Sequence, residues 1–355
     1  MLFLSTKIRI IVKKTLESIV FYVLFIIFAA MNDVSVIVYT SRDELPKLDS
    51  ADFFHGMELF NIYMETPRHS PLMAVAKCSD GRVLGQLLAV VRRRSSWLPL
   101  FFMWHCRIVG EGCYFGEVER RDELFGLMMA ALVKHLPVRV AYVELSHSSS
   151  KMFGYKALRL LGFFPVSWMN IHNSLHSKTP EERINEKMLQ RIDEAMDKGV
   201  HTRNVETEAD FKDFMRLLKA HNFLKIKRFI PDEIFFRRMA VSGHCRLLIT
   251  RYRNATIGCC AYAISRGNAY LWYAAFLRKS YLMLHPADVT IWNAIKQAYD
   301  EGCKHFCFLD VGLPYRANKL RDFLLKFGGK PISAFRWFKF RYGWINNLLA
   351  RIWSL

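Results

Sequence analysis

The sequence predicts a mixed α/β protein built from two similar units that follow each other along the chain. Two observations support this prediction. Segments of the first half recur in the second half in the same order, and both halves alternate apolar strands with amphipathic helices. A chain of 355 residues is also long enough for two domains of ordinary size.

Three pairs of segments make up this repeat. Two strands around a polar turn recur, so that Gly85 answers Gly258. A helix and a strand recur next, in "ELFGLMMAALVKHLPVRVAYVEL" and "VTIWNAIKQAYDEGCKHFCFLDV". A short helix, a glycine and an aromatic-rich strand close both halves, and there Gly162 answers Gly328. We therefore expect the same order of elements in both units.

The repeat divides the chain into four segments. They are an apolar leader (1–30), an N-terminal unit (31–166), a helical connector (167–205) and a C-terminal unit (206–355) with a basic, aromatic tail. The connector is predicted to hold one amphipathic helix, with Ile184, Met188, Ile192 and Met196 on one face.

The leader has basic residues followed by an apolar run at 19–30, as a signal peptide does. That run is short for a membrane span. Three explanations stay open: a signal peptide, a membrane anchor, or an extension upstream of a start at Met31. We favour the extension, because the residues after Met31 are typical of the start of a domain.

The first unit is expected to open with a strand at 34–39 and a helix capped by Asp49 or Ser50. Two strands follow around Asp80-Gly81, because glycine accepts the positive φ of a tight turn. A buried strand region, a helix and another strand complete the pattern at 97–109, 119–135 and 138–145.

The second unit repeats this alternation of helices and strands. Helices are predicted at 208–220, 231–240, 286–300 and 318–326, and strands at 245–252, 256–265, 269–276, 304–310 and 333–342.

The formal charge of +19 predicts a basic protein that attracts polyanions, such as phosphorylated cofactors, nucleic acid or anionic lipid. The charge does not choose among these partners. The eight cysteines lie mostly in apolar runs and the twelve histidines are scattered, so we expect reduced core thiols and no metal site.

The repeated unit resembles the GNAT acyltransferase fold, in which a "x-x-L-L-G-F" segment follows a helix, as in "ALRLLGFFPV". A tandem pair with a charged helical connector, and the block from Phe308 to Gly329, are similar to the Fem-type and CelD-like branch. The resemblance implies two GNAT-like domains, each a mixed, mostly antiparallel sheet flanked by helices.

The resemblance also implies transfer of an acyl group to an amine of a cell-envelope sugar, lipid or peptide precursor. The donor would be a thioester, acyl-CoA or acyl carrier protein, with no tightly bound cofactor. One alternative is an aminoacyl-tRNA-dependent transferase of the peptidoglycan type. Another is a non-catalytic GNAT-like binding protein in envelope assembly.

The sequence departs from ordinary GNAT enzymes at the pyrophosphate loop. The glycine-rich signature of that loop is replaced by "FLRKSYLMLHPADV" in the second unit and "CYFGEVERRDEL" in the first. This departure puts the use of acetyl-CoA in doubt.

The second unit is expected to perform the chemistry. Asp310 ends a strand where the sheet opens, so its carboxylate is a candidate base for the amine. Lys326 matches a lysine that the Fem-type branch places near the donor, and Tyr315 lies between the two in the sequence. The equivalent place in the first unit falls near Leu145, so we expect that unit to shape the acceptor groove.

Five residues are expected to bind the donor. Trp272 and Tyr273 lie on the strand whose splay admits the donor in GNAT folds. Arg278 and Lys279 replace the missing glycines with positive charge, and Lys319 lies near Tyr315.

The tail from Phe335 interleaves arginines and lysines with Trp337, Trp344 and Trp353, which suits a membrane interface. The competing interpretation, slightly favoured, is a final strand and an apolar helix docked on the core. We expect a cytoplasmic protein that either stays free or binds peripherally at the inner face of the membrane.

Overall fold

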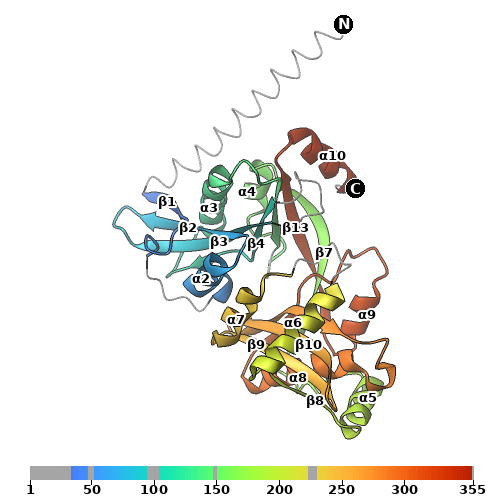
Figure 1. The fold of residues 1–355 in the computed structure, drawn as a ribbon. Coiled ribbons are helices and arrows are strands. Elements are labelled where there is room, and N and C mark those ends of the chain that lie inside the picture. Colours follow the sequence, from blue (N-terminus) through green and yellow to red (C-terminus); the bar gives the residue numbers. More distant parts are fainter. Residues whose placement is uncertain (1–32, 47–51, 94–103, 147–149, 223–229, 354–355) are drawn as a thin grey trace.

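The structure is a computed structural model of the chain (Figure 1). It describes residues 33–46, 52–93, 104–146, 150–222 and 230–353. The leader at 1–30 and the predicted helix caps Asp49 and Ser50 lie outside these residues. In the part of the chain that the structure describes, no helix is both long and apolar enough to span a membrane.

The first unit begins as predicted. β1 (Val34–Tyr39) is followed by the hairpin of β2 (His69–Cys78) and β3 (Val83–Arg93), whose turn places Gly81 at φ 84°. Between them lie the 3-10 turn η1 (Phe53–His55) and helix α2 (Met57–Glu65). Asp52 caps η1, because its carboxylate accepts a hydrogen bond from the Phe54 N–H at 3.0 Å. The rest of the unit comprises β4 (Trp104–Val109), β5 (Cys113–Tyr114), α3 (Arg121–His135), β6 (Tyr142–Ser146), α4 (Tyr155–Leu160) and β7 (Phe164–Ser174).

The range 167–205 is helical only in part. It holds the end of β7, helix α5 (Glu186–Asp197) and strand β8 (Val200–Asn204). The sequence analysis missed β8 because this strand lies at the edge of the sheet and is mostly polar, without apolar alternation.

The second unit contains the predicted helices and strands within a few residues. They are α6 (Glu208–Asn222), α7 (Glu233–Val241), β9 (Cys245–Tyr252), β10 (Ala255–Ser265), β11 (Asn268–Phe276), η3 (Leu282–Leu284), α8 (Pro286–Asp300), β12 (His305–Phe308), α9 (Lys319–Leu325), β13 (Lys330–Phe340) and α10 (Gly343–Trp353).

The strands of the described residues form one 13-stranded sheet. It is mostly antiparallel and flanked by helices, as the fold class predicted, but it runs through both units and does not form a separate sheet in each. Its order is β1-β2-β3-β4-β6-β13-β7-β12-β11-β10-β9-β8, with β5 beside β3. The last strand of the second unit, β13, therefore lies next to β6 of the first. The last strand of the first unit, β7, lies next to β12 of the second.

The two exchanged strands pair with each other over most of their length. The antiparallel ladder of β7 and β13 runs from His172 opposite Lys330 to Phe164 opposite Phe338. Each unit thus needs a strand of the other to continue its sheet. The exchange puts β7 and β13 at the centre of the molecule.

The repeated glycines occupy equivalent turns. Gly162 follows α4 with φ 81°, and Gly328 follows α9 with φ 87°. This left-handed conformation is one that glycine adopts without steric cost, and it turns the chain from the short helix into the last strand. The recurrence of this turn in both units supports the internal duplication.

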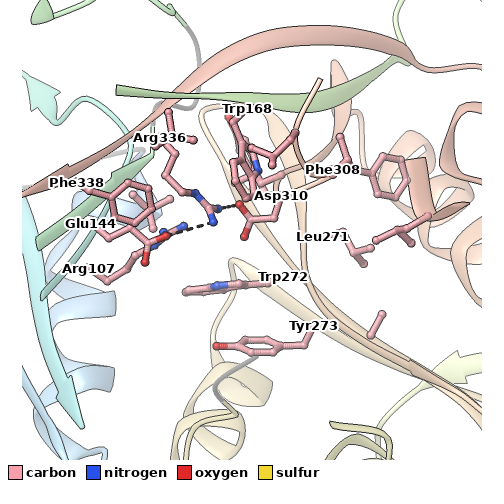
Figure 2. Close-up of a pocket in the computed structure, with 18 of the residues that line it drawn as sticks. Arg107, Glu144, Trp168, Leu271, Trp272, Tyr273, Phe308, Asp310, Arg336 and Phe338 are labelled. Atoms are coloured by element: carbon pink, nitrogen blue, oxygen red, sulfur yellow. Dashed lines mark hydrogen bonds and ion pairs between the residues drawn. The ribbon is translucent and has the colours of Figure 1, made fainter. Parts of the chain in front are cut away.

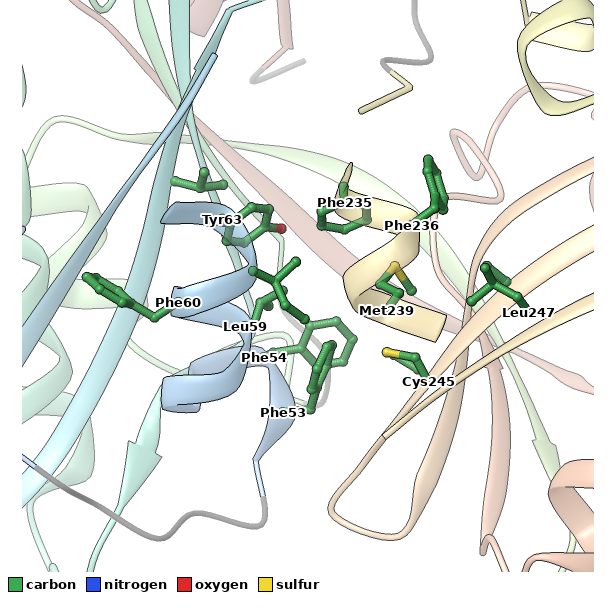
Figure 3. Close-up of a cluster of buried hydrophobic side chains, with 14 of the residues drawn as sticks. Phe53, Phe54, Leu59, Phe60, Tyr63, Phe235, Phe236, Met239, Cys245 and Leu247 are labelled. Carbon is green, nitrogen blue, oxygen red and sulfur yellow. The ribbon is translucent and has the colours of Figure 1, made fainter. Parts of the chain in front are cut away.

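A hydrophobic cluster joins the two units beside the sheet (Figure 3). Phe235 on α7 is fully buried, and its ring centroid lies 5.7 Å from that of Tyr63 on α2 and 5.6 Å from that of Trp272 on β11. Phe53 and Phe54 pack into the same cluster. Two further cores lie under α3 and α4 in the first unit and under α5, α8 and α9 in the second.

The tail is a strand and a docked helix, so the competing interpretation is confirmed for most of it. Trp337 is fully buried in β13, and the Arg336 side chain is 12% exposed. The prediction of a membrane interface is wrong for these two residues, because β13 is an interior strand of the sheet. The exposed apolar side chains of the tail are Tyr342 and, on α10, Trp344, Leu348 and Ile352.

Replacing Phe235 with alanine is predicted to lower the free energy of unfolding by about 3–5 kcal/mol, since it leaves a cavity between the units. Because the sheet and this cluster are continuous, urea unfolding should stay a single transition. The control is Ile234→Ala on the same helix, where a side chain that is 39% exposed should change stability by about 0.5 kcal/mol or less. Two separate transitions in the unchanged protein would contradict this account.

Candidate active site

A cavity of about 780 Å³ lies between the two units. Its wall follows one face of the central strands, where side chains alternate with a period of two. On β13 the residues Arg336, Phe338 and Phe340 face the cavity, while Trp337 packs on the opposite face against Tyr155 of α4. Both units and both exchanged strands therefore contribute to this cavity.

A row of polar side chains crosses the cavity wall from strand to strand. Arg107 on β4 lies opposite Glu144 on β6, and Arg92 on β3 lies two residues diagonally from Arg107. Arg336 on β13 continues the row, because it lies two residues from Phe338, which pairs with Glu144. Trp168 on β7 ends the row, again displaced by two residues.

Ion pairs connect this row (Figure 2). Glu144 pairs with Arg107 and, at 3.2 Å, with Arg336. Arg336 also pairs with Asp310, and its guanidinium lies 4.3 Å from the ring centroid of Trp168. A single arginine thus links a carboxylate of the first unit to a carboxylate of the second.

Burial shapes the electrostatics of these groups. It lowers the pKa of Arg336 to about 9, and the positive charges of Arg107 and Arg92 act in the same direction while Glu144 opposes them. Arg336 therefore still carries its charge at neutral pH. Burial and Arg107 also lower the pKa of Arg92, whose Nε donates to His105 Nε2 at 2.7 Å.

Asp310 is held in an unusual backbone conformation just after β12. Its φ is 71°, a left-handed value that aspartate adopts more readily than most residues. The following segment is fixed, because Val311 N–H donates to the Met169 carbonyl and Asn318 donates to the Val311 carbonyl. The Asp310 side chain is 50% exposed and lines the cavity. Strain of this kind is typical of functional positions.

The apolar end of the cavity lies where two parallel strands separate. β11 and β12 pair only as far as Leu271 opposite Phe308, although β11 continues to Phe276. The wall beyond this point is formed by apolar side chains, among them Ala274, Phe276, Ile291, Leu313, Leu320, Phe323 and Leu324. The splay gives a slot between the strands suited to an extended apolar chain.

The first unit has no such splay. Its parallel strands β4 and β6 pair up to Val109 opposite Ser146, and the Gly110 N–H still donates to the Ser146 carbonyl at 2.9 Å. The two units are alike in order of elements but differ at this point.

A β-bulge marks β11 where the strands begin to separate. Leu271 and Tyr273 have partners on β10, whereas Trp272 is an extra residue between them. As a result Trp272 and Tyr273 lie together on the cavity side, with ring centroids 5.8 Å apart (Figure 2). Burial raises the pKa of Tyr273, so this phenol stays protonated.

The segment before α8 takes the place of a phosphate loop. α8 begins at Pro286, which has no N–H, and Asp288 in its first turn is buried. Burial raises the pKa of Asp288, and the nearby charges of Arg191, His285, Arg278 and Lys326 oppose this shift. A buried carboxylate thus lies at this helix start, with several basic side chains near enough to act on its charge.

The structure brings together only some of the predicted site residues. Asp310, Trp272 and Tyr273 line the cavity. Arg278 and Lys326 gather around Asp288, outside the cavity lining. The remaining predicted residues, Tyr315, Lys279 and Lys319, are exposed and do not line the cavity.

Sequence reasoning missed the polar row. Arg92, Arg107, Glu144 and Trp168 were not singled out, and Arg336 was considered only as part of the tail, either at a membrane interface or in a docked strand. A signal was available, because a charged residue within a buried strand, as in "WHCRIV" and "AYVELS", needs a partner. Among the described residues, no group of three or more His, Cys, Asp or Glu is placed to hold a metal ion.

Replacing Glu144 with glutamine is predicted to destabilise the protein by about 3–5 kcal/mol, because two buried arginines lose their shared carboxylate. Urea denaturation measures the change. The control is Asp80→Asn in the exposed pair with Arg82, which should change stability by about 1 kcal/mol or less. Equal effects of the two substitutions would mean that the polar row is not a buried network.

Comparisons with known proteins agree with this geometry. Residues 186–317 match the family model described as acetyltransferase (GNAT) domain, a range that contains Trp272 and Asp310. No curated protein sequence matches the chain significantly. The matched range confirms the predicted enzyme class, an acyltransferase.

Solved structures with the same fold include FemX, with a TM-score of 0.60, 11% identity, and coverage of 89% of this chain and 100% of FemX. The C-terminal domain of a putative lysylphosphatidylglycerol synthetase from Agrobacterium fabrum has a TM-score of 0.54 and 11% identity, covering 86% of this chain and 92% of that domain. N-myristoyltransferase from Saccharomyces cerevisiae, with bound myristoyl-CoA and inhibitors, has a TM-score of 0.50 and 12% identity. The match covers 86% of this chain and 79% of that enzyme. At these identities the likeness shows the fold alone. The chain therefore has a tandem GNAT-like fold similar in architecture to that of FemX, and its residues 186–317 match the acetyltransferase (GNAT) domain.

Proposed function

We propose that the protein transfers an acyl group from a thioester donor, acyl-CoA or acyl carrier protein, to an amine of a cell-envelope sugar, lipid or peptide precursor. One observation carries this proposal: a single cavity runs from the splayed strands β11 and β12 to the carboxylates of Asp310 and Glu144. An apolar slot for the acyl chain and a carboxylate that can act as a base, in one cavity, are what acyl transfer to an amine requires.

The acyl chain occupies the apolar slot between β11 and β12. Burial there stabilises the complex by about 0.8 kcal/mol for each CH₂ group. Arg278 and Lys326 are the proposed partners of the donor phosphates, because both basic side chains lie near enough to the start of α8 to act on the charge of Asp288. The donor thus binds as a substrate, and the transfer needs no resident cofactor.

The amine is activated beside Asp310. Its nitrogen attacks the thioester carbonyl carbon, the C–N bond forms, and the C–S bond breaks as the thiolate leaves. Asp310 takes the proton of the amine and passes it to the leaving thiolate. The bulge at Trp272 interrupts the ladder at the same level, and a backbone N–H of this bulge stabilises the carbonyl oxygen as it becomes negative.

A second candidate is an aminoacyl-tRNA-dependent transferase. Pro286 and the buried Asp288 make the start of α8 a poor phosphate cradle, which weighs against a nucleotide thioester. The charge of +19 suits the phosphates of tRNA. FemX and the putative lysylphosphatidylglycerol synthetase share the fold.

Peripheral contact with the inner face of the cytoplasmic membrane is proposed for α10. Trp344, Leu348 and Ile352 form one stripe of this helix and are 71%, 53% and 56% exposed. Arg351 lies on the same side, and Leu349 and Trp353 line the cavity. Indole and aliphatic side chains with adjacent arginine suit an anionic lipid surface, at which an envelope precursor would enter the cavity.

Asp310→Asn is predicted to lower kcat by about 10²–10⁴-fold with a thioester donor and an amine, because the base is lost while the left-handed backbone is still tolerated. Release of free thiol measures turnover, and urea denaturation verifies that the variant folds. Full activity of the variant would remove Asp310 from the mechanism. If RNase treatment abolishes the activity of the unchanged protein, the donor is an aminoacyl-tRNA and not a thioester.

Replacing Trp344, Leu348 and Ile352 together with serine is predicted to reduce co-flotation with phosphatidylglycerol vesicles by about tenfold or more, since the stripe is the membrane contact. Val138→Ser and Val241→Ser, at side chains 78% and 79% exposed elsewhere, serve as controls and should float like the unchanged protein. Undiminished flotation of the triple variant would rule out α10 as the contact.

A further inference from the structure

We propose that the amine acceptor also carries an oxyanion, a carboxylate or a phosphate, which binds between Arg92, Arg107 and Arg336 beside Asp310. The inference rests on the proposed function, since it names a chemical group of the acceptor. It is carried by the charge balance of the cavity and by the hydrogen-bond donors in its wall.

The charge balance of the cavity is positive. Among the described residues that line it, four arginines face two carboxylates: Arg92, Arg107, Arg316 and Arg336 against Glu144 and Asp310. The tyrosines of the wall add no negative charge, because burial raises the pKa of Tyr63 to about 12 and also raises the pKa values of Tyr270 and Tyr273. An excess of positive charge in a partly closed space favours a bound anion.

Three of the arginines are close enough to repel one another. Arg92 and Arg107 lie diagonally on adjacent strands of the same face, and Arg336 follows across Glu144. The charges of Arg92 and Arg107 both disfavour the charged form of Arg336. Glu144 pairs with two of the three, which leaves their positive charge only partly compensated. A ligand oxyanion between them relieves this repulsion.

The wall also holds hydrogen-bond donors in need of an acceptor. Within the described residues, the buried Nε1 of Trp168 and the buried Nε of Arg336 have no hydrogen-bond partner. Both are N–H groups that only donate. An oxygen-rich anion satisfies such donors, whereas an ammonium group or an apolar group leaves them unpaired.

The position of Asp310 relates the oxyanion to the amine. Arg336 pairs with Asp310, so an anion bound at Arg336 lies next to the carboxylate that receives the amine. The amine and the acidic group of the acceptor are therefore a few bonds apart. A small zwitterion, such as an amino acid or an aminoalkyl phosphate end group, has this arrangement.

Inorganic phosphate and acetate are the probes for this site, because their binding needs neither donor nor turnover. Titration calorimetry should detect phosphate or acetate on the unchanged protein, and Arg92→Met should weaken binding by about tenfold or more, as expected for a lost charged hydrogen bond. Arg316 lines the cavity with an exposed side chain, so Arg316→Met does not put folding at risk. This substitution should also weaken anion binding, because it removes one positive charge from the cavity. Arg82→Met, in the exposed turn after β2, is the matched control and should bind like the unchanged protein.

Binding that is equal in all four proteins, or absent from the unchanged protein, would overturn the inference. Acceptor pairs extend the test to turnover: phosphoethanolamine against ethanolamine for a phosphate, and lysine against cadaverine for a carboxylate. The acidic member of at least one pair should have the higher kcat/KM, and Arg92→Met should remove that preference. Anion binding through Arg92 without transfer from any thioester would leave the oxyanion site standing while the proposed function fails.

Discussion

The pairing of β13 with β6 and β7 is the constraint on which the rest of the structure depends. It joins two units into one sheet and brings Arg336 of the second unit to Glu144 of the first. The same arginine reaches Asp310, so the exchanged strand assembles the polar end of the cavity. Neither unit alone contains this combination of side chains. The proposed active site therefore depends on the strand exchange and not on one domain alone.

The two units share the same order of helices and strands, but they contribute differently to the cavity. Both turn at a left-handed glycine after a short helix, at Gly162 and Gly328. Only the second separates its parallel strands into a slot, and only the second places a carboxylate at the end of that strand. The first unit contributes Arg92, Arg107 and Glu144 from strands that stay paired. This division explains how a duplicated fold supports one reaction in one cavity.

The fold could be predicted from the sequence because its signals are local. The turn at Gly81, the start of α8 at a proline and the alternation of β9 to β11 each follow from residues close together in the chain. The strand exchange has no such signal, since it depends on which distant strand pairs with β6. Asp310 could be predicted because it lies at the end of a strand that the local sequence indicates. Arg336 lies more than twenty residues further on, in the segment described as the tail, and only the strand exchange brings it to Asp310. Lys326 had a family resemblance in its favour, but it lies at the end of α9, where its charge acts on Asp288, and it does not line the cavity.

A crystal structure with a non-reactive thioether analogue of a long-chain acyl-CoA tests the central claim most directly. The account predicts that the acyl chain lies between β11 and β12, with its carbonyl group beside Asp310 and the bulge at Trp272. An analogue bound between β4 and β6, or outside the cavity that the two units share, would contradict it.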